Sequence, residues 1–419
     1  MSCNDWKAYK LEDITINITD GKHGNCVDEE NSGYYFISAK DINEGRINYK
    51  NARQITKSDY EDVHKRTKLE LDDVLITNSG TIGKMAIITE KDKVNSTTFQ
   101  KSVAIIKPIK SLVSPKFLYY NLNFNIRYLI NLAGGSVQKN LLLKDLRNLK
   151  LNIPSIEEQE KIASILSSLD DKIELNNEMN KTLEEMAQSL FKRWFIDFEF
   201  PNEDDEPYKS SGGEMVDSEF GMIPKGWEVK CIGNIGNVIT GKTPSAKVEG
   251  SYGDECNFIT PRDINSSPII IDTERKLSSI GINNLKKNLV CKNSIGVSCI
   301  GSNLGEVYIT GENSITNQQI NTLVLKEGKI YPYVYIYLKN MKDEFLNMAG
   351  GSAVPIINKT SFSGINILMP NMYILNKFVQ SITCYFERIE ANLKENESLI
   401  ALRDSLLPKL MSGEIDLSK

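Results

Sequence analysis

One stretch of the chain matches a motif known for phosphate chemistry. The residues GNVITGKT, at positions 236–243, fit the pattern GxxxxGK[ST], in which a glycine-rich loop cradles the phosphates of a nucleotide. Such a loop works where it follows a buried strand and opens a helix, because the helix N-terminus supplies N–H donors. Pro244 and the segment SAKVEGSYGDE follow here, and they are unsuited to begin a helix. We therefore predict no nucleotide site at this stretch.

The residue types that perform hydrolysis or bind metals are scattered. The two histidines, His23 and His64, lie in polar stretches without further metal ligands at suitable spacing. The seven cysteines form no CxxC pair and are odd in number, so we expect reduced thiols rather than disulfides or a zinc site. The sequence thus predicts no catalytic residue, no metal and no cofactor in this chain.

Polar loops offer a different chemistry, the recognition of DNA. Arg, Lys, Asn, Gln, Ser and Thr can bond base edges, and cations and backbone donors can bond phosphates. Each loop could equally be an ordinary turn whose glycines adopt positive φ angles. The candidate DNA contacts are, in the first part of the chain, Lys22, His23, Lys40, Asn78, Ser79, Lys84, Gln100, Lys101, Gln138 and Lys139, and, in the second part, Lys242, Thr243, Arg262, Ser302, Asn303, Gln318, Gln319 and Asn358.

These loops belong to two copies of one pattern. The segment FISAKDIN at 36–43 returns as FITPRDIN at 258–265, and TTFQKSVAIIK at 97–107 aligns with TNQQINTLVLK at 316–326. The frame is shared, whereas the polar residues at the loop tips differ. An internal repeat of this length predicts two similar domains.

Each copy has the composition of a β-rich domain. Short alternating or β-branched runs such as YYFIS, MAIIT and NTLVLK are separated by clusters of Gly, Asn, Asp and Ser. This pattern predicts a curved, mostly antiparallel sheet with loops. The segments 116–133 and 333–349 favour helices, and a Gly-Gly pair follows each of them.

A long helix follows each copy. The segment from Pro154 to about Phe195 has no internal Pro or Gly, and Ser155 and Glu158 form a capping box at its start. A helix of about 38 residues is about 55 Å long, which exceeds the width of a small domain. Its seven-residue series, typical of a coiled-coil seam, is Ile162, Leu169, Asn176, Leu183 and Leu190, and this series returns 216 residues later as Phe378, Tyr385, Asn392, Leu399 and Leu406.

We expect the two helices to pair with each other, because each alone would expose an apolar seam. An antiparallel pairing would let Asn176 and Asn392 face each other near mid-helix and fix the register. The alternative is that each helix packs on its own domain. The predicted division of the chain is a first domain at 1–153, a long helix at 154–197, an acidic linker at 198–225, a second domain at 226–369 and a second long helix at 370–419.

The charge is distributed unevenly along the chain. The formal net charge is −5, yet residues 1–153 carry +5 and residues 226–369 carry +2, whereas residues 154–225 carry −11. Mildly basic domains suit DNA, and an acidic helix suits a protein partner, although a solvated helix face explains the acids equally well. Since we find neither an apolar run of membrane-spanning length nor a signal peptide, we expect a cytoplasmic protein.

The chain resembles a known family over essentially its whole length. The segments IPSIEEQEKIASILSSLDDKIELNN and QSLFKRWFIDFEFPN are similar to the central conserved region of type I restriction–modification specificity subunits. The segment LRDSLLPKLMSGEI is similar to their distal conserved region, and the Gly-Gly-Ser element before Ile-Pro also fits.

The resemblance implies a fold and a function. The fold is of the α+β class, with two β-rich target-recognition domains separated by a pair of long antiparallel coiled-coil helices in a pseudo-two-fold repeat. Each domain would recognise one half of a split sequence in double-stranded DNA. The helices would dock two DNA adenine-N6 methyltransferase subunits, and a subunit for ATP-dependent translocation and cleavage can join them.

The resemblance also implies that this chain is not an enzyme. It contains neither the glycine-rich S-adenosylmethionine loop nor the (Asp/Asn/Ser)-Pro-Pro-(Tyr/Phe) motif that an adenine methyltransferase needs. The alternative function is a protein-binding scaffold, in which two β-rich domains are carried on a coiled coil that forms oligomers.

Overall fold

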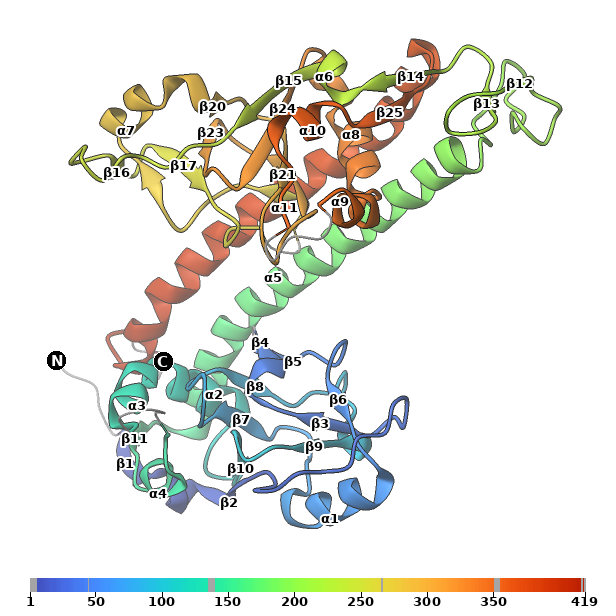
Figure 1. The fold of residues 1–419 in the computed structure, drawn as a ribbon. Coiled ribbons are helices and arrows are strands. Elements are labelled where there is room, and N and C mark those ends of the chain that lie inside the picture. Colours follow the sequence, from blue (N-terminus) through green and yellow to red (C-terminus); the bar gives the residue numbers. More distant parts are fainter. Residues whose placement is uncertain are drawn as a thin grey trace. The chain divides into compact units, whose positions relative to one another are not determined.

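The chain divides into two compact units. Unit 1 comprises Met1–Ile173 and Ser398–Lys419, and unit 2 comprises Glu174–Glu397. The computed structural model shown in Figure 1 describes residues 6–43, 45–134, 140–264, 267–349, 355–415 and 417.

Unit 1 contains a β-rich domain with two main sheets (Figure 1). The first sheet has the antiparallel order β2 (Thr15–Asp20), β10 (Val103–Pro108), β7 (Val74–Thr77) and β8 (Met85–Ile87). The second has the order β6 (Arg53–Gln54), β3 (Tyr35–Ile37) and β9 (Thr97–Phe99), with β3 and β9 parallel. Two smaller pairs are β1 (Lys7–Lys10) with β11 (Lys150–Ile153), and β4 (Ile42–Asn43) with β5 (Arg46–Ile47). The helices of this domain are α1 (Lys57–Thr67), α2 (Pro115–Phe124), α3 (Ile126–Leu132) and α4 (Leu143–Arg147).

Unit 2 contains a domain of the same design. Its first sheet has the order β15 (Gly236–Thr240), β24 (Ile320–Leu325), β21 (Ile295–Ser298), β22 (Val307–Thr310) and β18 (Ile269–Ile270). Its second sheet has the order β16 (Tyr252–Gly253), β19 (Lys276–Leu277), β17 (Cys256–Ile259), β23 (Ser314–Thr316) and β20 (Leu289–Val290). A further pair is β14 (Glu228–Cys231) with β25 (Asn366–Met369), and the helices are α6 (Ile232–Ile235), α7 (Ser279–Asn284), α8 (Tyr331–Lys339), α9 (Lys342–Met348) and α10 (Lys359–Ser363). The repeat predicted from the sequence is therefore present as two domains that share a strand order, to which unit 2 adds β18 in the first sheet and β16 and β20 in the second.

The central strands are apolar on both faces because each face meets a different core. In strand β7, Val74 and Ile76 belong to the cluster that contains Phe117 of helix α2. Leu75, between them, belongs to the cluster that contains Phe99 of the second sheet. A strand covered on both faces needs a continuous apolar run, which is what VLIT supplies.

The two shorter helices predicted from the sequence are each broken into two. The segment 116–133 forms α2 and α3, which meet at Asn125, and the segment 333–349 forms α8 and α9. The side-chain amide of Asn125 donates to the carbonyl oxygen of Asn121 at 2.8 Å. A side chain that bonds to nearby backbone in this way competes with the backbone hydrogen bonds of a helix. Composition alone did not predict this break at Asn125.

The two long helices are α5 (Ile156–Phe191) and α11 (Met372–Met411), and each contributes residues to both units. In unit 1, Ile162 of α5 and Leu410 of α11 are buried in the core of the first domain. In unit 2, Phe191 of α5 meets Phe378 of α11 edge to face, with ring centroids 6.1 Å apart. The predicted division at 153/154 and 369/370 thus differs from the compact units, because the ends of both helices complete the domain cores.

Asn176 and Asn392 are both buried in unit 2, and each donates a hydrogen bond to another asparagine of the facing helix. The amide of Asn176 donates to Asn396 Oδ1 at 2.9 Å, and the amide of Asn392 donates to Asn180 Oδ1 at 2.8 Å. Since Asn180 and Asn396 also lie 216 residues apart, the two bonds are related by the internal repeat. The seven-residue series predicts one polar seam position in each helix, Asn176 and Asn392, and does not identify Asn180 or Asn396.

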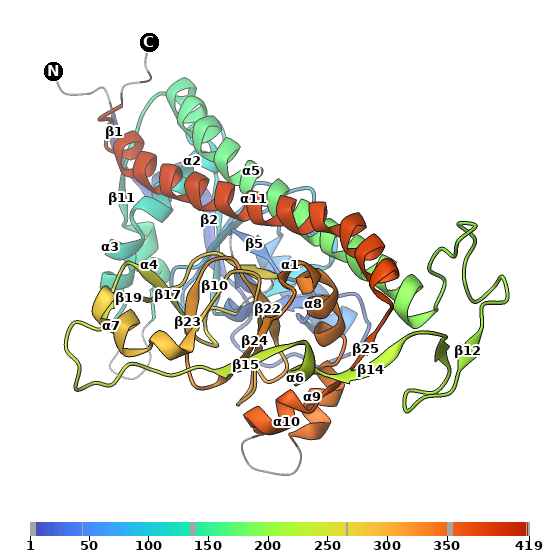
Figure 2. The same ribbon diagram turned by 90° about the horizontal axis from the view of Figure 1, so that it is seen from above.

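The segment predicted as an acidic linker forms an ordered lobe of unit 2, seen from above in Figure 2. Its strands β12 (Met215–Val216) and β13 (Ile223–Pro224) pair with each other. Phe200 is buried and stacks on Trp227 and on Tyr208, at centroid distances of 5.1 and 4.5 Å. The acids and the Ser-Ser-Gly-Gly run of this segment predict a linker. In the structure, burial of its aromatic side chains stabilises a folded segment instead.

Candidate nucleic-acid interface

The predicted polar loops of unit 1 meet at the ends of the central strands. They are the loops at 19–25, 38–40, 78–84 and 98–101, together with the described ends of the loop at 134–140. Backbone hydrogen bonds join them from Lys22 N to Phe99 O (2.9 Å), from Gln100 N to Ile37 O (2.8 Å), from Asn78 N to Ser102 O (3.0 Å) and from Leu141 N to Asn78 O (2.8 Å). Residues far apart in sequence therefore share one surface.

The corresponding loops of unit 2 are joined in the same way. The equivalent bonds run from Lys242 N to Thr316 O (2.8 Å), from Asn317 N to Ile259 O (2.9 Å), from Cys299 N to Gln319 O (2.8 Å) and from Ile357 N to Cys299 O (2.9 Å). The frame that brings the loops together is thus made by backbone groups, which leaves the side chains at the tips free to differ.

These bonds correct one alignment made from the sequence. Strand β3 pairs Ile37 with Phe99, and strand β17 pairs Ile259 with Thr316, so Phe99 corresponds to Thr316. The true offset in this segment is 217 residues, and the sequence alignment, which used 219, was wrong by two. A shift of two residues keeps every strand side chain on the same face, so the apolar pattern alone could not detect the error.

A capped turn presents one cation in each domain. In unit 1 the backbone N–H and hydroxyl of Ser38 donate to Asp41 Oδ2 at 2.9 and 2.7 Å. In unit 2 the same groups of Thr260 donate to Asp263 Oδ2 at 2.8 and 2.7 Å. Lys40 and Arg262 lie on these turns, and both are exposed.

A glycine loop stands beside each turn, between β7 and β8 in unit 1 and between β21 and β22 in unit 2. Gly80 and Gly83 have positive φ angles, as do Gly301 and Gly305. At Gly83 an added Cβ would also lie 2.5 Å from the side chain of Ile126. This position therefore needs glycine for structural reasons. That requirement fits the alternative interpretation, in which these loops are ordinary turns.

Several predicted contact residues bond within the loops. Thr243 donates to the side chain of Gln318 at 2.6 Å, and Asn303 donates to the carbonyl oxygen of Pro261 at 3.0 Å. Asn358 caps helix α10 by accepting from the backbone of Ser361 at 2.9 Å. These side chains therefore stabilise the local conformation of their loops.

The remaining candidates differ in their exposure. The side chain of Asn78 is buried, and its Oδ1 has no hydrogen-bond partner among the described residues. Lys84 donates to Asn43 at the neighbouring turn. Lys101, Ser302 and Gln318 are exposed, whereas Ser79, Gln100 and Gln319 are half-buried. Gln138 and Lys139 lie outside the described residues.

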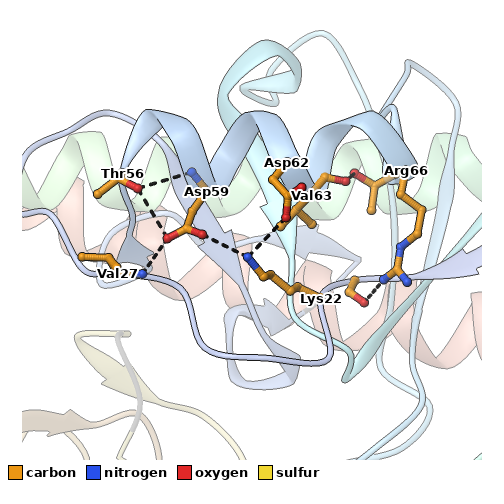
Figure 3. A network of polar contacts seen from close by, with 9 residues as sticks. Lys22, Val27, Thr56, Asp59, Asp62, Val63 and Arg66 are labelled. Atoms are coloured by element: carbon orange, nitrogen blue, oxygen red, sulfur yellow. Dashed lines mark hydrogen bonds and ion pairs between the residues drawn. The ribbon is translucent and has the colours of Figure 1, made fainter.

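Lys22 and His23, in the first loop of unit 1, each lie beside a carboxylate. Lys22 Nζ lies 3.0 Å from Asp59 Oδ1 and 3.4 Å from Asp62 Oδ2, both on helix α1 (Figure 3). His23 Nε2 lies 2.9 Å from Asp20 Oδ2. The N–H of Val27 and the ammonium of Lys22 lower the pKa of Asp59, and the hydrogen bond to Asp59 raises the pKa of Lys22. Lys22 and Asp59 therefore both stay charged at neutral pH.

Two further residues, neither of them predicted from the sequence, hold the first loop of each domain in place. The guanidinium of Arg66, at the end of helix α1, donates to the carbonyl oxygen of Asp20 at 2.8 Å. The amide of Asn288 donates to the carbonyl oxygen of Thr240 at 2.9 Å in unit 2. Arg66 and Asn288 are 222 positions apart, which is also the offset between FISAKDIN and FITPRDIN. This shared offset was the only signal of their equivalence in the sequence.

The stretch that resembles a phosphate-binding loop lies in another context. Residues Gly236–Thr240 form strand β15, and residues 241–245 have no regular secondary structure, so no helix begins there. Within the part of the chain that the structure describes, no group of histidine, cysteine and acidic side chains could hold a metal ion. None of the described helices is both long enough and apolar enough to cross a membrane.

Comparison with known proteins gives one consistent family. Residues 4–185 and 224–399 match the family described as the type I restriction modification DNA specificity domain. The chain is 30% identical to the type I restriction enzyme HindI specificity subunit of Haemophilus influenzae, over 98% of this chain and 100% of that protein. It is 29% identical to the MjaIX specificity subunit of Methanocaldococcus jannaschii, over 98% of this chain and 94% of that protein.

A solved structure shares the fold. The crystal structure of a type I restriction–modification system S subunit from M. genitalium matches with a TM-score of 0.56. The sequence identity is 16%, and the match covers 98% of each chain.

Proposed function

This chain belongs to the family of type I restriction–modification DNA specificity subunits, and we propose that it selects the DNA sequence on which the catalytic subunits of such a complex act. The match of both repeats to the family and the 30% identity over nearly the whole chain support this function. Methyl transfer, and cleavage where it occurs, then belong to partner subunits.

Each domain recognises one half of a split target. The observation that carries this proposal is the loop surface, which is built by equivalent backbone bonds in both units but has different side chains at its tips. Lys40 corresponds to Arg262, and Lys101 corresponds to Gln318. Two surfaces with one frame and different hydrogen-bonding groups suit two different half-sites.

The long helices act as the spacer between the two DNA-recognition domains. Half-sites recognised from one face of the duplex are separated by about 34 Å, or one helical turn, so the readers need a fixed separation. The bonds between Asn176 and Asn396 and between Asn180 and Asn392 support a fixed helix register. The internal repeat of domain and helix also suits the recruitment of two identical adenine methyltransferase subunits, as a symmetric dimer would.

The function is tested by mapping N6-methyladenine across a genome that carries the complete system. We expect one bipartite, asymmetric motif to be methylated at nearly all of its occurrences, and this methylation to disappear when the gene for this chain is deleted. An intact complex that methylates no motif would remove the proposal and favour the protein-binding scaffold.

The division of labour is tested by exchanging residues 1–153 for the first domain of a relative. Only one half of the methylated motif should change, because the second loop surface is left intact. The reciprocal exchange of residues 226–369 is the matched control and should change the other half. If either exchange altered both halves, one domain would not correspond to one half-site.

A further inference from the structure

The first loops of the two domains have the same frame. Thr56 caps helix α1 by accepting from the backbone of Asp59 at 3.3 Å, and Ser278 caps helix α7 by accepting from the backbone of Gly281 at 3.3 Å. The bond from Arg66 to Asp20 corresponds to the bond from Asn288 to Thr240. Lys22 and Lys242 therefore occupy equivalent positions, and helix α7 together with the 3₁₀ turn Lys286–Asn288 takes the place of helix α1 at an offset of 222 residues.

The charges on this shared frame are different. In unit 1, Asp59 accepts from the ammonium of Lys22 at 3.0 Å with one oxygen and from the N–H of Val27 at 2.7 Å with the other (Figure 3). The side chains of Lys22 and Asp59 are only 26% and 20% exposed, so this pair is partly shielded from water. Asp62 adds a second carboxylate at 3.4 Å.

Unit 2 has no acid at either of these positions. Gly281 stands in place of Asp59, and Asn284 stands in place of Asp62. An added Cβ at Gly281 would lie 2.1 Å from the carbonyl oxygen of Ser251, so the backbone leaves no room for a side chain there. Lys242 is exposed and has no ion pair among the described residues, and the neighbouring 3₁₀ turn Lys286–Asn288 adds two exposed lysines.

We infer that Lys242 contacts a DNA phosphate in unit 2, whereas Lys22 contacts none and instead positions the loop at 20–27 through Asp59. The inference rests on the proposed function and goes further, because it divides the phosphate contacts unequally between two equivalent loops. A phosphate that approached Lys22 would have to displace two carboxylates, one of which is held by a backbone N–H. At Lys242 it would displace only solvent and counterions.

The salt dependence of binding tests this inference, because each phosphate contact releases counterions. The full chain, assembled with its methyltransferase subunits, is titrated with a duplex that carries the methylated motif at several KCl concentrations. The slope of log K against log[KCl] should become less steep by about 0.9 in the Lys242→Ala variant, as expected for the loss of one contact. The matched Lys22→Ala variant should leave this slope unchanged, even if it weakens binding.

A second variant keeps the test valid if Lys22→Ala does not fold. The double substitution Asp59→Asn with Asp62→Asn removes both negative charges but leaves an oxygen that can accept from Val27. It frees Lys22 for a phosphate, so the slope should become steeper by about 0.9.

The outcomes separate this inference from the function on which it rests. Equal flattening by Lys22→Ala and Lys242→Ala, or no flattening by Lys242→Ala, would overturn the inference while leaving sequence-specific recognition intact. A wild-type complex that binds motif and non-motif duplexes equally would overturn the proposed function itself, and the inference with it.

Discussion

At the scale of single residues, the choice among the candidate DNA contacts depends on which side chains already bond within the protein. Thr243, Asn303 and Asn358 have the types that recognise bases, but they bond to their own loops. Lys40 and Arg262 are exposed on turns in which Asp41 and Asp263 accept hydrogen bonds from backbone N–H groups. These two residues are therefore the best candidates for direct contact with base edges.

We predict that Arg262→Ala relaxes recognition in the half-site of the second domain only. Loss of a bidentate contact between arginine and guanine costs about 1–3 kcal/mol of discrimination at one base pair. Methylation mapping of the variant should show one degenerate position in that half of the motif. Lys40→Ala is the matched control, and any change that it causes should fall in the other half. A uniform loss of methylation without a change in motif would instead indicate a phosphate contact.

At the scale of elements, the long helices are specified by buried amides as well as by their apolar seams. Asn176, Asn180, Asn392 and Asn396 are all buried, and they bond in two pairs across the helices. A buried amide that loses its partner costs about 1–3 kcal/mol, so each pair disfavours any shifted register.

A double-mutant cycle measures this coupling. We predict that Asn392→Leu lowers the free energy of unfolding by about 1–3 kcal/mol, because the amide of Asn180 loses its donor. The double variant Asn180→Leu with Asn392→Leu should lose less than the sum of the two single effects, since both polar groups are then removed together. Urea denaturation of the wild type, the two single variants and the double variant gives the cycle. The same cycle can be measured for Asn176 and Asn396, which form the equivalent pair in the internal repeat. Strict additivity would show that the amides do not act as a pair.

At the scale of the whole molecule, the compact units differ from the units of the repeat. One repeat consists of a domain and the helix that follows it, but each compact unit also includes part of the other helix. In unit 1 the buried Leu410 of α11 completes a core that residues 1–197 alone would leave open. A fragment that contains one repeat therefore exposes apolar surface on both its domain and its helix.

We predict that the fragment 1–197 forms a homodimer. Asn180 is the repeat equivalent of Asn396, so a second copy can offer its Asn180 to Asn176 in place of the missing residue, and its helix end can cover the open core. Analytical ultracentrifugation should show a dimer that Asn176→Asp with Asn180→Asp weakens, because like charges would then be buried together. A folded monomer at micromolar concentration would contradict this prediction.

The sequence by itself determined the repeat, the β-rich character of each domain, the long helices and the loops that contain the candidate residues. These features follow from local periodicity, capping residues and turn residues, which act over a few positions. The family could be recognised for the same reason, since its motifs are contiguous stretches of the chain.

The tertiary structure alone decided which of the candidate side chains already bond within the protein and which can bond to DNA. Lys22 and Asp59 are 37 positions apart, and nothing in their local sequence shows that one neutralises the other. Asn176 was visible as a polar seam residue, but its partner depended on a helix stagger set by packing across 220 positions. Contacts of this kind arise when distant segments are brought together by burial of the cores, so they have no signature in a single sequence.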